Sequence, residues 1–146
     1  MATDNFVPTP LELHMAFAFG PGLALNMYPA ELLNYGATCL SSDGQPAESE
    51  TYFLCLQSDA VGGLWTPLYV TRGQDREPIT EDCKTGFPEF VRGLSFYSPR
   101  ELWQVPHKAA KKASSISHDK SGPKLANRVS GRWMPALAKF PAAPSA

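Results

Sequence analysis

Large apolar residues alternate with small or polar residues near the start of the chain, with the period of two that is typical of β-strands. The alternation runs through residues 11–19, and the Gly-Pro-Gly sequence at 20–22 predicts a turn. It resumes over residues 23–28. The pattern therefore predicts two neighbouring strands in this part of the chain.

Two later segments carry the strongest strand patterns. Residues 51–57 are apolar and aromatic on both faces, which indicates a central strand covered from two sides. Residues 64–71 have a similar pattern and are expected to be its neighbour. Because Pro67 has no N–H to donate, we expect this strand at an edge of the sheet or with a bulge. Shorter strands are expected at residues 37–40 and 94–97.

Proline and glycine positions predict short helices. Residues 29–36 begin with proline, which suits the first helical position, and end with glycine, which suits the left-handed residue after a helix. Ser98 and Glu101 have the spacing of a capping box around Pro99. A second helix is therefore expected to start at Ser98 and to stop before Pro106.

The segment 107–117 predicts a third, weak helix with two different sides. Three basic residues share one side, namely Lys108, Lys111 and Lys112. Small and apolar residues share the other side, namely Ala109, Ala113 and Ile116. This apolar stripe is too thin to drive helix formation alone, so the helix needs support from the rest of the protein.

These elements together predict an α+β fold, with a small antiparallel sheet of about four to six strands. Two or three short helices and an extended, basic C-terminal tail are expected with the sheet. An SH3-like or other small barrel is the alternative architecture. Residues 135–146 are rich in proline and alanine and predict an extended end to the chain.

The composition fits one globular domain, because 146 residues with 43% hydrophobic content suffice for a core. No apolar run reaches the roughly 18 residues that a membrane span requires. The first residues lack the basic and apolar stretches of a secretory signal. We therefore expect a soluble, cytoplasmic protein that does not enter a membrane.

The three cysteines, Cys39, Cys55 and Cys83, match no C-x-x-C metal or redox pattern. Each lies among apolar or strand-like residues, so we expect them to be small core residues. A Cys39–Cys55 disulfide is the alternative in an oxidising compartment.

The net charge of −1 hides a strong asymmetry. Residues 1–106 hold 13 acidic and 5 basic side chains, whereas residues 107–146 hold 8 basic side chains and one acidic one. We therefore divide the chain into an acidic globular body, 1–106, and a basic, Pro/Ala-rich C-terminal segment, 107–146. Such a segment either binds an acidic partner or folds back onto its own acidic body.

The basic segment is the strongest candidate binding site, and its proposed partner is nucleic acid or an acidic protein surface. The candidate residues are Lys108, Lys111, Lys112, Lys120, Lys124, Arg128, Arg132 and Trp133. Lysine and arginine bind phosphates and release counterions, and an exposed tryptophan can stack on an unpaired base. The hypothesis is a non-enzymatic binding or regulatory protein.

Other functions find weaker support in the sequence. His14, His107 and His118 lack the spacing of zinc ligands, and no nucleotide-binding or G-x-S-x-G motif occurs, so we expect no metal and no cofactor. A small, toxin-like ribonuclease is one alternative, with His118, Asp119, Lys120 and Arg128 as its acid, base and phosphate-binding groups. A structural or assembly subunit with extended arms, including a homo-oligomer, is the other.

Overall fold

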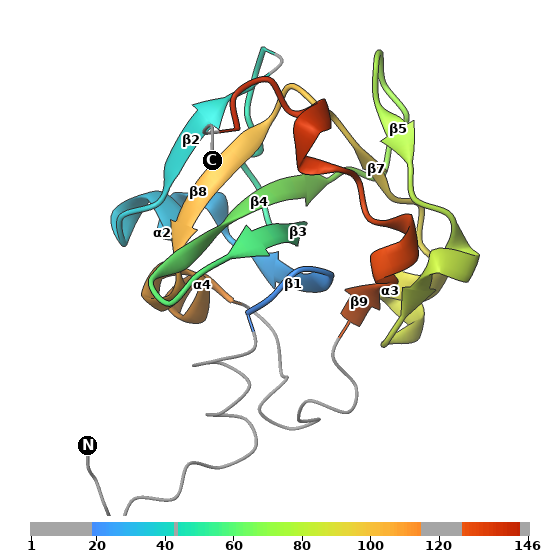
Figure 1. The fold of residues 1–146 in the computed structure, drawn as a ribbon, viewed down its shortest axis with the longest axis horizontal. Coiled ribbons are helices and arrows are strands. Elements are labelled where there is room, and N and C mark those ends of the chain that lie inside the picture. Colours follow the sequence, from blue (N-terminus) through green and yellow to red (C-terminus); the bar gives the residue numbers. More distant parts are fainter. Residues whose placement is uncertain (1–18, 43, 115–126, 144–146) are drawn as a thin grey trace, which may run out of the picture.

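Seven strands form one antiparallel sheet in the order β2-β8-β4-β3-β1-β9-β6 (Figure 1). The structure, a computed structural model, describes residues 19–42, 44–114 and 127–143. The strands are β1 (Leu23–Met27), β2 (Thr38–Ser41), β3 (Thr51–Ser58), β4 (Gly62–Leu68), β6 (Lys84–Thr85), β8 (Leu102–Pro106) and β9 (Asn127–Val129). A separate two-stranded sheet pairs β5 (Glu77–Pro78) with β7 (Phe96–Tyr97).

The helices are short. They are α2 (Pro29–Asn34), α3 (Pro88–Arg92) and α4 (His107–Ala113), with 3₁₀ turns η1 (Glu81–Cys83), η3 (Gly131–Trp133) and η4 (Leu137–Lys139). The helix predicted from residue 29 is confirmed, with proline at its start and Gly36 at φ +100° just after its end. Within the described ranges, no helix is long and apolar enough to cross a membrane.

Each face of the large sheet carries its own hydrophobic core, because successive side chains of a strand point to opposite faces. The first face packs against α2 and α4; its buried residues include Leu25, Met27, Phe53, Trp65, Trp103 and Val105, with Leu32, Ala109, Ala110 and Ala113 from the helices. The second face packs against α3, β7 and residues 134–143; its buried residues include Leu54, Leu64, Leu68, Leu102, Phe90, Tyr97 and Phe140.

The α+β prediction with an antiparallel sheet and a few short helices is confirmed, but the strands outnumber the expected four to six. The additional ones are two or three residues long, as in Lys84–Thr85 and Asn127–Val129, which is too short for an alternating pattern to be visible. The SH3-like alternative is not supported. The sheet is open, with β2 and β6 at its two edges and no pairing between them in the described part of the chain.

The prediction that the strand containing Pro67 lies at an edge is wrong, because β4 lies between β8 and β3. Proline is accommodated there because pairing with β8 covers only Gly62 to Trp65. Pro67 therefore pairs on one side, with Phe53 of β3. The strand does lie beside a bulge, but the extra residue is Leu56 in β3.

The capping box predicted at Ser98 and Glu101 does not start a helix. The Arg100 amide donates to the Ser98 hydroxyl at 3.2 Å and the Glu101 amide donates to the Ser98 carbonyl at 3.1 Å, which makes a turn. The residues after it form strand β8, in which Leu102 is buried on the second face and Trp103 on the first. Tertiary burial on two faces outweighs the local helix signal.

The predicted helix over residues 107–117 is confirmed over His107–Ala113, whereas Ile116 lies outside the described residues. The strand predicted at residues 11–19 also lies outside them, except for Phe19, which is buried. The parts of the chain before and after residue 106 contribute strands to the same sheet, because β9, which follows residue 106, pairs with β1 and β6, which precede it. Phe140, in the segment predicted to be extended, is buried against the second face.

All three cysteines carry free thiols, and Cys55 and Cys83 are buried as predicted. Cys39 pairs with Trp103, Trp103 with Trp65, and Trp65 with Cys55 across neighbouring strands. Three strand spacings of about 4.8 Å separate the two cysteines, far beyond the ~7 Å that a disulfide bridges. Burial raises the pKa of the Cys55 thiol to about 12, so it is a neutral core residue.

Candidate functional site

The α4 lysines predicted as binding residues are exposed together. Lys108, Lys111 and Lys112 lie on the outer side of the helix, while Ala109, Ala110 and Ala113 are buried in the first core. The buried alanines fix which side faces outward, because a helix repeats every 3.6 residues. The Lys112 ammonium lies 5.9 Å from the centre of the Tyr35 ring. Among the described residues, no carboxylate forms an ion pair with these lysines.

A second group of candidate residues surrounds β9 and η3. Arg128 is half-buried in β9, opposite Leu23 of β1. Arg132 and Trp133 follow in η3, and 56% of Trp133 is exposed. The Arg132 guanidinium carbon lies 5.6 Å from the centre of the Trp133 ring. This pair offers a cation and a flat aromatic surface side by side.

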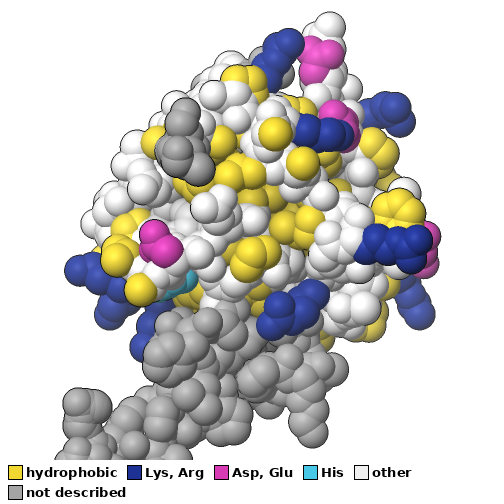
Figure 2. Space-filling view, in the orientation of Figure 1, with side chains coloured by type: hydrophobic (Ala, Val, Ile, Leu, Met, Phe, Trp, Pro, Cys, Tyr) yellow, Lys and Arg dark blue, Asp and Glu magenta, His cyan; other side chains and the backbone are white. Residues whose placement is uncertain are grey.

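The two basic groups meet β1 at opposite ends. Ser114, directly after α4, bridges to Met27, whereas Arg128 pairs with Leu23. In Figure 1, α4 and β9 accordingly flank β1. In Figure 2, lysine and arginine side chains lie along the lower edge of the coloured surface, and others lie near its top. Lys120 and Lys124 lie outside the described residues, so the structure describes two groups rather than the whole predicted site.

Two of the three histidines, His14 and His118, lie outside the described part of the chain, so the structure does not test the catalytic roles suggested for them. His107 is described: its Nε2 lies 2.7 Å from the Asp59 carbonyl oxygen, and its ring packs against Phe19 at 5.5 Å between centroids. These contacts are those of a packing residue. Within the described ranges, no group of three or more histidine, cysteine or acidic side chains is arranged to hold a metal ion.

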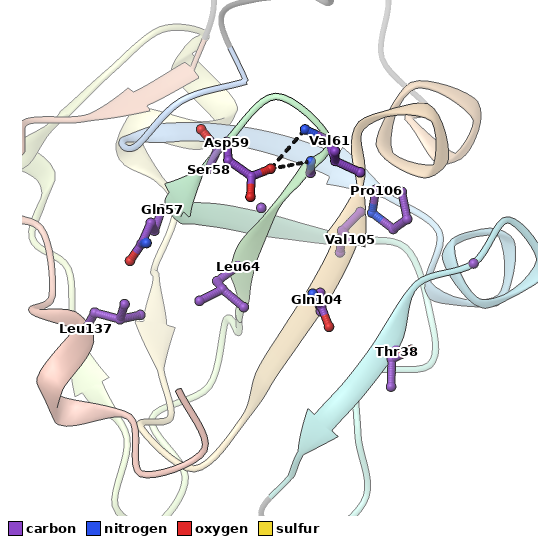
Figure 3. A pocket seen from close by; sticks show the side chains of 13 residues that line it. Thr38, Gln57, Ser58, Asp59, Val61, Leu64, Gln104, Val105, Pro106 and Leu137 are labelled. Atoms are coloured by element: carbon purple, nitrogen blue, oxygen red, sulfur yellow. Dashed lines mark hydrogen bonds between the residues drawn. The ribbon is translucent and has the colours of Figure 1, made fainter. Parts of the chain in front are cut away.

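The structure also contains a pocket of about 480 Å³ that sequence reasoning missed (Figure 3). It opens on the second face of the sheet, beside the β3–β4 turn. Its lining residues are Gly36, Thr38, Gln57, Ser58, Asp59, Val61, Gly62, Gly63, Leu64, Gln104, Val105, Pro106 and Leu137. The volume lies within the range of small-ligand sites, about 300–1,000 Å³.

Four of these residues form one straight line across four strands. Thr38 pairs with Gln104, Gln104 with Leu64, and Leu64 with Gln57. We call this line the pocket row. Because directly paired residues point to the same face, the row presents two carboxamides on either side of one leucine. Figure 3 shows Gln57 and Gln104 on opposite sides of Leu64 in this way.

The bulge in β3 brings Gln57 to this face. Cys55 pairs with Trp65 on the first face, so strict alternation would return Gln57 to that face as well. The extra residue, Leu56, shifts the register so that Gln57 pairs with Leu64 instead. Bulges re-aim side chains in this way. A local irregularity that alternation does not predict therefore completes the pocket row.

Asp59 lies in the turn at one end of the pocket. Its Oδ1 accepts hydrogen bonds from the Val61 amide at 2.8 Å and from the Gly62 amide at 3.1 Å (Figure 3). These two amides lower the pKa of the Asp59 carboxyl, so it is ionised at neutral pH. Both bonds fall on Oδ1, and no described residue donates a hydrogen bond to Oδ2. Of the described lining residues, Asp59 is the only ionisable one.

Glycine at the neck of the turn permits close backbone packing. A Cβ atom at Gly62 would lie 2.5 Å from the Val105 carbonyl oxygen, and one at Gly63 would lie 2.7 Å from that of Gln57. Because glycine has no Cβ at these two positions, β4 can approach β3 and β8 closely at the pocket. One residue in the sequence could have indicated the pocket: Gln104 is polar but stands inside an otherwise apolar strand.

The chain matches no known protein family, and neither the curated proteins nor the solved structures include a chain with significant similarity to it.

Proposed function

We propose that this protein is a non-enzymatic binding protein that engages single-stranded nucleic acid through its basic C-terminal segment. The observation that carries the proposal is the outward side of α4, where Lys108, Lys111 and Lys112 are exposed and unpaired with any described carboxylate. Such lysines contact phosphates and release the counterions condensed on the strand. Their positions are fixed by the buried alanines, so they are already held in place for binding.

Trp133 favours nucleic acid over an acidic protein surface. An aromatic side chain that is 56% exposed offers a stacking platform for an unpaired base, and the neighbouring Arg132 adds a cation for the adjoining phosphate. An acidic protein surface would use the lysines but would gain little from the exposed ring. Because α4 and η3 lie near opposite ends of β1, an extended strand suits them better than a compact ligand.

The test is fluorescence anisotropy with a single-stranded oligonucleotide over a series of salt concentrations. We expect affinity to fall as salt rises, with a logarithmic slope of about −0.7 for each phosphate contact. The double variant Lys111→Gln/Lys112→Gln should reduce the slope by about 1.4. The matched control, Arg72→Gln/Arg92→Gln, removes the same charge from exposed positions elsewhere and should leave the slope nearly unchanged.

Two outcomes would contradict the proposal. Binding that is insensitive to salt would exclude phosphate contacts, and equal losses in both double variants would indicate a general charge effect rather than a site on α4. Polyglutamate separates the partner classes: if it binds as tightly as the oligonucleotide and Trp133→Ala changes neither affinity, the partner is an acidic protein surface. On the nucleic-acid proposal, Trp133→Ala costs about 1–3 kcal/mol.

A further inference from the structure

We propose that the pocket beside the β3–β4 turn accepts a single nucleobase, and that it binds adenine in preference to uracil. The inference rests on the proposed function for the strand that carries the base. The pocket itself is a separate site, formed by different residues from those of α4 and η3. The pocket row, Thr38, Gln104, Leu64 and Gln57, crosses its floor.

The two glutamines are spaced to bind the edges of a planar ring. Each lies one strand away from Leu64, so their backbones are about 10 Å apart. Both side chains are exposed, and no other described residue forms a hydrogen bond with either carboxamide. A carboxamide offers a donor and an acceptor together, which is the pattern that binds adenine at N6 and N7.

The remaining lining residues suit the faces of such a ring. Leu64 is the apolar floor between the glutamines, and Leu137 of η4 forms a wall next to Gln57 and Leu64 (Figure 3). Val61 and Pro106 continue this apolar lining toward the turn. Pockets for small molecules commonly combine an apolar lining with a few placed polar groups.

Asp59 determines which groups can enter. Its ionised carboxylate repels a phosphate or carboxylate, and the described lining residues include no basic side chain to compensate. Oδ2 can accept a hydrogen bond from an exocyclic amino group, which adenine has. Uracil carries a carbonyl oxygen where adenine carries that amino group, and two acceptors that face each other form no hydrogen bond. The part of the ligand inside the pocket is therefore a neutral ring that bears an amino group.

The pocket also lies next to the basic helix. Pro106 lines the pocket, and α4 begins at the following residue. The His107 amide donates to the Val61 carbonyl at 2.9 Å, which fixes the start of the helix against the pocket rim. A strand whose base occupies the pocket therefore has its phosphates outside, beside the lysine-bearing helix.

The test compares oligoadenylate with oligouridylate of equal length by fluorescence anisotropy. We expect roughly tenfold tighter binding of oligoadenylate, since one good base contact supplies that discrimination. Gln57→Leu/Gln104→Leu should reduce the preference several-fold, with the remainder supplied by Asp59, and leave the salt dependence unchanged. The control Gln74→Leu changes an exposed glutamine that does not line the pocket, and it should preserve the preference.

A second measurement uses wild-type protein and uncharged nucleosides, so it depends neither on the variants nor on phosphate contacts. Adenosine should shift the amide resonances of Gly62, Gly63 and Gln104, and uridine should shift them much less.

Equal binding of the two homopolymers together with no adenosine shift overturns the pocket proposal, and salt-dependent binding would still support the α4 function. Shifts with a neutral sugar such as maltose but none with adenosine also overturn the pocket proposal. Adenosine shifts without salt-dependent oligonucleotide binding overturn the α4 function and retain the pocket.

Discussion

The same four strands present two very different lines of residues on their two faces. On the first face, Cys39, Trp103, Trp65 and Cys55 form a line that we call the buried row. On the second face, the pocket row crosses the same strands, one residue away from the buried row in β2, β8 and β4 and two residues away in β3. The buried row is covered by helices, whereas the pocket row lies where the cover of the second face ends.

Adjacent positions in one strand therefore serve separate purposes. Trp103 is fully buried and packs edge-on against Phe53, with the ring centroids 5.4 Å apart. Its neighbour Gln104 is exposed and lines the pocket. Alternation thus allows one strand to contribute to stability on one face and to a candidate binding site on the other.

The sharpest test of the comparison replaces these neighbours one at a time. Trp103→Ala removes a large buried ring and should lower the free energy of unfolding by about 3–5 kcal/mol. Gln104→Ala removes an exposed side chain and should change it by less than about 0.5 kcal/mol. Urea denaturation measures both values. Similar values for the two variants would mean that the two faces do not differ as described.

Part of the buried row was within reach of sequence analysis, because the apolar patterns over residues 51–57 and 64–71 predicted the core strands that hold Cys55 and Trp65. Trp103 was placed in a helix instead. The helix at Pro29 and the helix starting at His107 follow from local signals in the same way. The exposed lysines of α4 were predictable from their spacing alone.

The pocket was not predictable, because it depends on register. Gln57 reaches the pocket only through the bulge at Leu56, and Thr38 reaches it only because β2 pairs with β8, more than sixty residues away in the chain. The helix signal at Ser98 failed for a similar reason: burial of Leu102 and Trp103 on opposite faces requires a strand. Long-range pairing determined both outcomes, and local patterns do not contain it.

The next largest effect is expected at the polar end of the first face, where Glu101 is buried. Its carboxylate accepts hydrogen bonds from the Trp103 indole at 2.8 Å and the Ala47 amide at 3.0 Å, and also from the Tyr69 hydroxyl. Glu101→Gln replaces one carboxylate oxygen with an NH₂ group, which is a donor and cannot accept these hydrogen bonds. We expect a loss of about 1–3 kcal/mol in the free energy of unfolding.

The control for this variant is Glu89→Gln, at an exposed position of α3, which should be nearly neutral. Burial, the hydrogen bond to Glu101 and the charge of that carboxylate all raise the pKa of Tyr69. Glu101→Gln removes that charge, so spectrophotometric titration should detect Tyr69 ionising at lower pH in the variant. An unchanged Tyr69 titration and unchanged stability would show that Glu101 does not hold this corner together.

A smaller, pH-dependent effect is expected on the second face, where Lys84 is buried among Phe90, Gly93 and Ser95. Burial lowers the pKa of Lys84 from its ordinary value of 10.5. A lysine with a lowered pKa in the folded state favours folding more as it loses its proton. The stability of the wild type should therefore rise relative to Lys84→Met as pH increases through the lowered pKa toward 10.5, and then level off.

Urea denaturation at pH 8 and at pH 10.5 measures this difference for Lys84→Met, with Lys108→Met as the control at an exposed position of α4. We expect the stability of the wild type relative to Lys84→Met to be higher at pH 10.5 than at pH 8, and the control to show no such change. A difference that stays constant with pH, or that changes equally in the control, would show that the buried ammonium is not penalised on this face.

The smallest effect concerns how the cover of the second face is held. Lys139 of η4 lies 2.7 Å from Glu77 of β5, and both side chains are about half exposed. Hydrogen bonding to Lys139 and to Tyr97 lowers the pKa of Glu77, so the pair stabilises the fold above the ordinary carboxyl pKa of 4.5 and this contribution is lost as pH falls through the lowered pKa. Lys139→Gln should cost only about 0.2–1 kcal/mol, less at high salt, because water screens an exposed pair.

A double-mutant cycle with Glu77→Gln isolates that coupling, and it should vanish in the pH range where Glu77 is protonated. The helix cover of the first face relies on buried alanines of α4, whereas η4, which carries the pocket wall Leu137, is held in part by this screened pair. Raising salt should therefore increase amide hydrogen exchange around Leu137 more than in α4. Equal exchange in both segments would show that the second face is covered as firmly as the first, and that the pocket wall does not depend on the ion pair.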